Sequence, residues 1–196
     1  MTVYNEARGI FQTTGERDRE AWALESLSKL LVRKGQFREA ISPSSLAAQA
    51  YRETKNPYRQ GRALRILGVA EWQVHRIVPA VAILEQAAAC FEETGDRQEE
   101  AAVLIDCGRL MPWLLRGTEA VALLERAASI YRETGDRDGE GLALDSLRRA
   151  RKSARWQRWL PQPLVHLFSG PPVRWSTSTD RVPGTDVAPH DLGLRR

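Results

Sequence analysis

The chain of 196 residues lacks the features of membrane, secreted and metal-binding proteins. No run approaches the roughly 20 apolar residues that span a bilayer, and the first residues, MTVYNEARGI, lack the basic start and apolar core of a signal peptide. Two cysteines, Cys90 and Cys107, cannot build a disulfide framework, and three histidines without a CxxC pair offer no zinc ligand set. We therefore expect a cytoplasmic protein with no membrane contact, metal or cofactor.

Catalytic motifs are absent as well. The sequence contains no P-loop, no GxSxG and no HExxH. Asp106, Cys107 and His75 come nearest to a cysteine nucleophile with a base. However, Cys107 aligns with Leu27 and Leu67 in the repeats described below, which is a core position, and a buried cysteine usually acts as a small apolar side chain. We expect no enzyme activity.

Positive charge is concentrated near the C-terminus. Residues 151–196 carry 8 Lys+Arg and 3 Asp+Glu, whereas residues 1–150 carry 21 and 22 and are nearly neutral. The larger part of the chain therefore has no excess of cations with which to follow a phosphate backbone. A helical repeat that binds nucleic acid is the weaker alternative for the function.

A period of 40 residues runs through most of the sequence. Thr14-Gly15-Glu16-Arg17 recurs as Thr94-Gly95-Asp96-Arg97 and as Thr134-Gly135-Asp136-Arg137, and Thr54-Lys55-Asn56-Pro57 fills the intermediate place. Within each unit the apolar residues have helical spacing, and a small residue recurs at Ser28, Gly68 and Gly108. Each unit is therefore predicted to form two amphipathic helices joined by a short turn.

This pattern resembles the tetratricopeptide (TPR) repeat, in the extended form of kinesin light chains and of the repeat arrays in large bacterial regulators. The small residue of the first helix and two alanines of the second helix stand at the family's spacing. Leucine takes the place of the family's usual aromatic residues, at Leu24, Leu64, Leu104, Leu144, Leu84 and Leu124. The resemblance covers about residues 3–150 and implies an all-α fold, a right-handed α-solenoid of antiparallel helix pairs.

The repeat units are placed at about 14–53, 54–93, 94–133 and a partial 134–150, within a repeat domain of residues 1–150. The segment 3–13 is predicted to be an orphan second helix, because Ile10 and Phe11 align with Ala50 and Tyr51. First helices are expected near 17–34, 57–74, 97–114 and 137–150, and second helices near 37–53, 77–93 and 117–133. Pro43 and Pro112 should each bend or shorten a helix. The basic, Pro/Gly/Ser-rich segment 151–196 is predicted to be a disordered tail.

The resemblance also implies where a partner binds, because TPR arrays hold ligands on the concave face formed by the first helices. Carried over by alignment, the predicted partner-binding residues are Trp22, Glu25, Lys29, Arg33, Arg62, Arg65, Trp72, Arg109 and Trp113. Tryptophan and arginine dominate binding hot spots, and Arg62, Arg65 and Arg109 are predicted to converge on one acidic segment. In the alternative interpretation the arginines are solvated or pair with glutamates such as Glu25 and Glu71, while the tryptophans pack between repeats.

The sequence therefore predicts a non-catalytic scaffold that binds a protein or peptide, acidic in character, on its concave face. Self-association through the ragged ends of the solenoid is a further expectation. The alternative is a sensor or regulatory repeat fragment of a bacterial multidomain transcriptional regulator.

Overall fold

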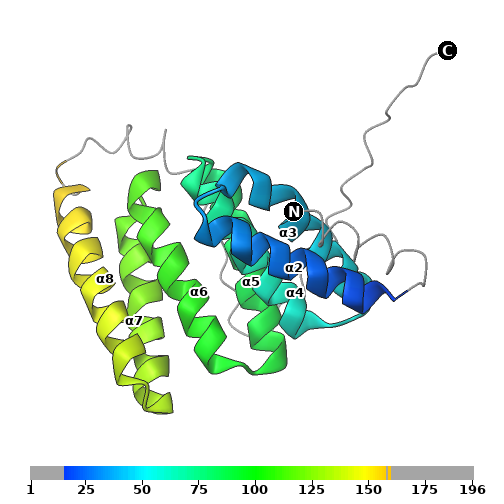
Figure 1. Ribbon diagram of the computed structural model, residues 1–196. Coiled ribbons are helices and arrows are strands. Elements are labelled where there is room, and N and C mark those ends of the chain that lie inside the picture. The colour runs from blue at the N-terminus through cyan, green and yellow to red at the C-terminus, as the bar shows by residue number, and fades with distance from the viewer. Residues whose placement is uncertain (1–15, 158, 160–196) are drawn as a thin grey trace.

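The computed structural model describes residues 16–157 and residue 159. These residues form seven α-helices and no strand, as the sequence predicts. With the labels of Figure 1, the first helices are α2 (Arg17–Arg33), α4 (Pro57–Gln73), α6 (Arg97–Leu110) and α8 (Arg137–Gln157), and the second helices are α3 (Phe37–Glu53), α5 (Ile77–Thr94) and α7 (Gly117–Thr134). A short 3-10 helix, η1 (Met111–Leu114), follows α6. The predicted helix at 3–13 and the predicted tail from residue 160 onward lie outside the described residues.

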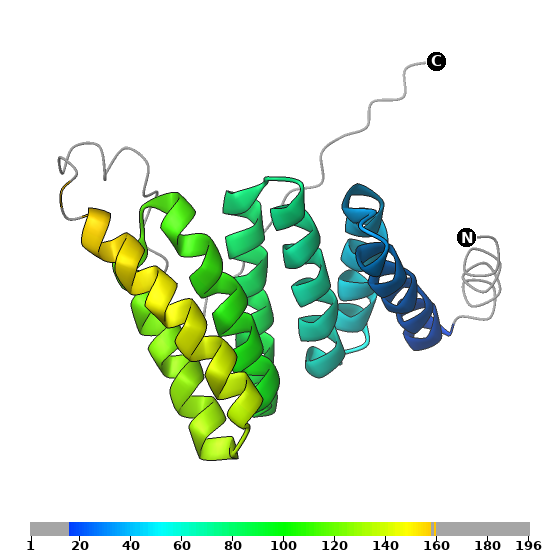
Figure 2. The ribbon, with the colours of Figure 1, turned by 60° about the vertical axis from the view of Figure 1, so that its left-hand side comes forward.

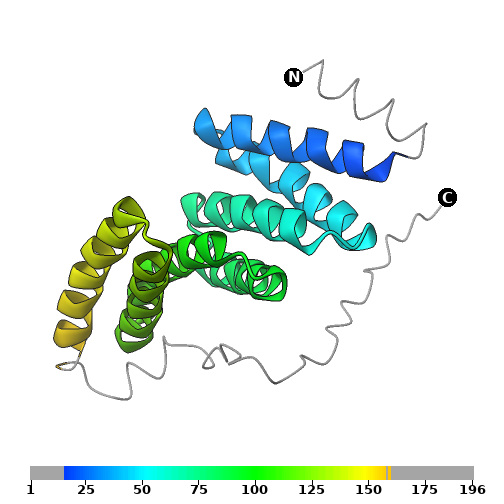
Figure 3. The same cartoon turned by 90° about the horizontal axis from the view of Figure 1, so that it is seen from below.

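The helices stack in one row of antiparallel pairs. Figure 2 shows the row from α2 and α3 (blue) at one end to α8 (yellow) at the other. Seen from below, the helix axes turn progressively from α2 to α8, so the row is a solenoid (Figure 3). Because α2 contacts α4, α4 contacts α6 and α6 contacts α8, the first helices form a continuous face. Among the described helices, none is long and apolar enough to cross a membrane.

Matching turns keep the period constant. Each turn contains one residue with a positive φ: Gly35, His75 and Leu115 within repeats, and Lys55, Gly95 and Gly135 between repeats. After each of the three turns between repeats, a side chain accepts a hydrogen bond from the backbone: Asn56 from the Arg59 N–H at 3.2 Å, Asp96 from the Glu99 N–H at 3.1 Å, and Asp136 from the Gly139 N–H at 2.9 Å. These side chains cap α4, α6 and α8, so the helices begin at equivalent places in successive repeats.

The small residue of each first helix lets the second helix of the same repeat pack closely. A Cβ added at Gly68 would lie 2.6 Å from Cγ of Leu84, and one added at Gly108 would lie 2.6 Å from Cγ of Leu124. Both leucines are almost fully buried. The interior therefore has no room for a larger side chain at these two positions.

The structure differs from the sequence predictions at the end of α8 and at Pro43. α8 continues past residue 150, and the buried Gln157 accepts a hydrogen bond from the Gly117 N–H at 2.9 Å, which ties the helix end to α7. Of the bend or shortening expected at Pro43, the shortening does not occur: α3 continues through this residue to Glu53, and the hydroxyl of Ser44 donates to the Ala40 carbonyl at 2.6 Å. Leu144 is 39% exposed, whereas its equivalent in α6 is buried, because no described second helix covers α8.

The prediction for Pro112 is confirmed. α6 ends at Leu110, and the chain continues as η1, with Pro112 in the first turn of the 3-10 helix. Proline lacks the N–H that would continue the α-helical hydrogen bonds, so the helix tightens and ends there.

Candidate functional site

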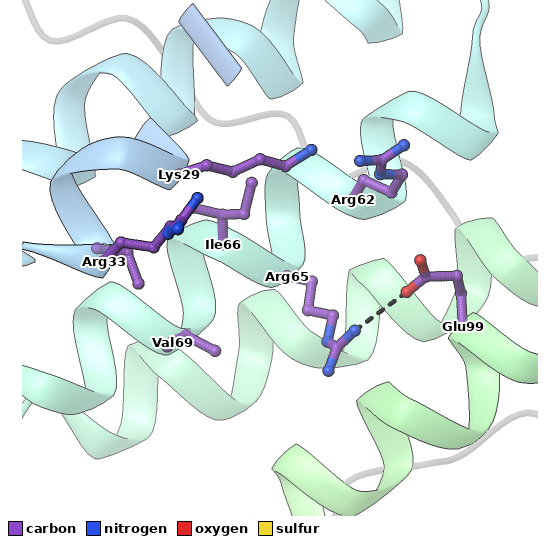
Figure 4. Close-up of a pocket in the computed structure, with 8 residues that line it drawn as sticks. Lys29, Arg33, Arg62, Arg65, Ile66, Val69 and Glu99 are labelled. Carbon is purple, nitrogen blue, oxygen red and sulfur yellow. Dashed lines mark hydrogen bonds and ion pairs between the residues drawn. The ribbon is translucent and has the colours of Figure 1, made fainter. Parts of the chain in front are cut away.

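A cavity of about 380 Å³ opens on the face formed by the first helices. Its lining combines aliphatic and charged side chains: Val32, Ile66 and Val69, with Lys29, Arg33, Arg62, Arg65 and Glu99. Figure 4 shows Lys29 and Arg33 reaching from α2, Arg62 and Arg65 from α4, and Glu99 from α6. Four of the predicted partner-binding residues, the two from α2 and the two from α4, are thus brought together.

Glu25 joins three helices beneath the rim of this cavity. Its carboxylate lies 2.6 Å from Nζ of Lys29 and 3.3 Å from Nη2 of Arg62, and it accepts a hydrogen bond from the Tyr51 hydroxyl at 3.0 Å. Burial raises the pKa of Tyr51 to about 12, so its hydroxyl remains a donor. Glu25 is only 2% exposed. It was predicted to contact a partner, but its burial makes it an internal acceptor instead.

Arg65 links α4 to α6. Its Nε donates to Oδ2 of Asp106 at 2.9 Å and its Nη1 donates to Oε2 of Glu99 at 3.1 Å, the ion pair drawn in Figure 4. Burial opposes the charge of the guanidinium, but the two carboxylates outweigh it and raise the pKa of Arg65. Sequence reasoning missed Asp106 as part of this face. The available signal was its separation of 41 residues from Arg65, close to one period.

The three arginines predicted to converge engage different neighbours. Arg62 pairs with Glu25 on α2, Arg65 reaches α6, and Arg109 donates from Nε to the Ser146 hydroxyl on α8 at 3.2 Å. Arg109 does not line the cavity. Arg33 differs from all three, since among the described residues it makes no hydrogen bond or ion pair through its side chain.

The predicted tryptophans fall into two groups. Trp22 on α2 and Trp113 in η1 are 56% and 70% exposed and are available to a partner. Trp72 is partly buried and packs against the main core. Of the predicted aromatic contacts, Trp22 and Trp113 therefore remain the stronger candidates.

Neither thiol has the environment of a nucleophile. Cys90 and Cys107 are both buried, as their core positions predict. Burial raises the pKa of Cys90 to about 11 and that of Cys107 well above its usual value, so both remain protonated near neutral pH. The described part of the chain also contains no group of three or more His, Cys, Asp or Glu side chains placed to hold a metal ion.

Comparison with solved structures identifies the fold. No protein-family model matches the chain, and no curated protein matches it. Two crystal structures of a kinesin-light-chain-like protein from Podosopora anserina, with nearly identical TPR-like repeats, have TM-scores of 0.66 and 0.65 at 19% and 20% sequence identity. They cover 85% and 84% of this chain, which spans 82% of theirs.

The crystal structure of BtubC (BKLC) from P. vanneervenii has a TM-score of 0.53 at 18% sequence identity. The match covers 85% of this chain and 72% of the BtubC chain. The fold is a TPR-like solenoid. The resemblance inferred from the 40-residue period is thereby confirmed at the level of the fold. Within this TPR-like solenoid, the cavity lies on the face where the resemblance implies partner binding.

Proposed function

We propose that this TPR-like solenoid is a scaffold that binds an acidic peptide segment of a partner protein in the cavity between α2 and α4. The observation that carries the proposal is the combination of an aliphatic floor, formed by Val32, Ile66 and Val69, with cations around it. An apolar floor takes up an apolar side chain and excludes water, while guanidinium and ammonium groups at the edge bind carboxylates.

The internal ion pairs leave a positive balance at the cavity. Glu25, Glu99 and Asp106 supply three carboxylates to Lys29, Arg62 and Arg65, and Arg33 adds a fourth cation that has no counter-ion among the described residues. Lys29 also keeps 42% of its side chain exposed. Arg33 is therefore the group best placed to receive a carboxylate of the ligand, with Lys29 beside it.

The proposal is tested by selecting peptides from a displayed library on the full chain and measuring their affinity for single variants. Selected peptides should carry net negative charge. Arg33→Glu should weaken their binding by at least 10-fold, because a hydrogen bond to a charged group contributes about 1.5–3 kcal/mol. Val69→Asp should also weaken binding, because it introduces a like charge into the floor.

The matched control is Arg38→Glu, which makes the same charge change at an exposed position of the second helix α3 and should leave the affinity unchanged. A substitution at Arg65 would not test peptide binding by itself, because it would also leave Asp106 and Glu99 without the arginine with which they pair. If the peptides bind Arg33→Glu and Arg38→Glu with equal affinity, they bind another surface and the proposal fails.

A further inference from the structure

The outer face of α8 has the features that receive a second helix in the other repeats. In α4, a Cβ at Gly61 would lie 2.9 Å from Cζ of Phe91 and 3.1 Å from Cβ of Cys90, both on α5. In α8 the equivalent residue is Gly141, and no described atom lies within 4 Å of a Cβ added there. Leu144, next on this face, is 39% exposed although its counterparts at Leu24, Leu64 and Leu104 are buried.

The sequence contains one further segment with the residues that such a face requires. Two periods of 40 residues after Cys90 and Phe91 are positions 170 and 171, which would face Gly141. The chain has Gly170 and Pro171 there. Ile10 and Phe11 are in the same phase of the repeat, two periods before Cys90 and Phe91. Residues 3–13 therefore carry the apolar pair in the register that α8 needs, whereas the residues that follow α8 do not.

We propose that residues 3–13 of a second copy of this chain pack on the outer face of α8 as its second helix. Phe11 of the second copy then covers Gly141 and Leu144, as Phe91 covers Gly61 within the chain. Each added copy continues the solenoid of the preceding one in phase. This surface is separate from the cavity between α2 and α4, so the inference does not depend on the proposed peptide binding.

Two properties of the contact follow from the residues. Arg148 stands where Ser28, Gly68 and Gly108 let the second helix approach closely, so one end of the contact is looser than an internal one and the association is reversible. The contact joins different surfaces of the two copies. Such a heterologous contact leaves one free surface at each end, so it produces open chains of increasing length and does not stop at a dimer.

Disulfide trapping tests the register directly. The internal counterpart places a Cβ at position 61 close to that of Cys90, within reach of a disulfide, so Ile10→Cys and Gly141→Cys should be equally near across two copies. Mixing the two single variants under mild oxidation should give a linked heterodimer at least 10-fold faster than mixing Ile10→Cys with Ser129→Cys, an exposed position of α7. The native thiols are buried and should not compete.

A chain with both substitutions should give a ladder of linked dimers, trimers and longer products. Equal rates with the Ser129→Cys control, or a double variant that links only within one chain, would overturn the proposal. A double variant that forms a ladder only after residues 160–196 are removed would also overturn it, because those residues would then be the occupant of α8.

A second measurement does not depend on cysteine chemistry. Sedimentation of the wild-type chain should show a mass that rises with concentration, and Gly141→Arg should abolish the rise while keeping the helical signal. Arginine fits there in the single chain because no described atom is near, and it has a better helix propensity than glycine. A Gly141→Arg chain that folds and associates as the wild type does would contradict the proposal.

Discussion

Gly61 and Gly141 occupy the same position of their repeats, yet the first is packed against Phe91 and the second has no described neighbour. Glu85, in the middle of the solenoid, and Glu125, near its C-terminal end, are also equivalent positions that differ in burial. One carboxylate oxygen of Glu85 is buried and has no hydrogen-bond partner among the described residues, whereas the exposed Glu125 pairs with Arg151 at 2.7 Å. The energetic role of a repeat position therefore depends on whether another helix covers it, and substitutions at matched positions can measure this difference.

The largest difference is expected at the small residues. Gly108→Val should destabilise the fold by more than about 3 kcal/mol, because its Cβ would collide with the fully buried Leu124. Gly141→Val should change the stability of the single chain by less than about 0.5 kcal/mol, since glycine and valine differ little in helix propensity. Urea unfolding at low protein concentration measures both. Similar losses in the two variants would show that α8 is covered within the chain.

The next largest difference concerns the leucines. Leu104→Ala should cost about 3 kcal/mol, because the side chain is 1% exposed and its removal leaves a cavity. Leu144→Ala, at 39% exposure, should cost less than about 1 kcal/mol in the single chain. Thermal unfolding of the two variants at equal dilution is the measurement, and a reversed order would contradict the assignment of α8 as a terminal helix.

Glu85 should make the free energy of unfolding depend on pH. Burial raises the pKa of Glu85 to about 7, while Arg116 partly opposes this change. Because the folded-state pKa lies above the unfolded value, the stability from this group is full below the unfolded pKa, near pH 4.5, and falls as the pH rises to about 7.

Glu85→Gln should remove that fall, and above pH 7 the variant should be more stable than the wild type by less than about 2 kcal/mol, after allowance for partial solvent exposure. Chemical unfolding between pH 4.5 and 7 measures the free energy of unfolding. If this free energy still falls with rising pH in Glu85→Gln, another group causes the fall.

The smallest effects are expected in the turns. His75 and Leu115 have φ values of 64° and 55°, a region that side chains with a Cβ adopt at a cost. His75→Gly should therefore stabilise the protein by about 0.5–1 kcal/mol, whereas Gly135→Ala, at a φ of 74°, should destabilise it by a similar amount. Differential scanning calorimetry would resolve the two opposite shifts, and shifts of the same sign would contradict the explanation.

The helix positions could be read from the sequence because the period of 40 residues and the helical spacing both depend on residues close together in the chain. The first helices expected to begin near residues 17, 57, 97 and 137 do begin there. The end of α8 was missed because it depends on a distant contact, the hydrogen bond from the Gly117 N–H to Gln157. A contact between residues so far apart in the sequence cannot be predicted from a local pattern.

The candidate site was predictable in part. The period assigned Lys29, Arg33, Arg62 and Arg65 to one face, and they line one cavity. The interpretation in which arginines pair with glutamates named Glu25 and Glu71, and the structure pairs them with Arg62 and Arg76. The contacts of Arg65 and Arg109 were not predictable, because they join residues slightly out of the 40-residue register. Arg65 and Asp106 are 41 residues apart, and Arg109 and Ser146 are 37 residues apart. These offsets depend on how far neighbouring helices slide along each other. The acidity of the partner, the cytoplasmic location and the link to a bacterial regulator remain predictions.

The constant period has a consequence for how arrays of this kind change over generations. Helices α2, α4, α6 and α8 begin at Arg17, Pro57, Arg97 and Arg137, with no insertion between successive units. Unequal recombination between two units of the gene would therefore delete or duplicate a whole repeat and leave every remaining junction in phase. The number of repeats can then change in one step, while the side chains that line each groove diverge one substitution at a time. A lineage could lengthen its array first and acquire a new ligand afterwards.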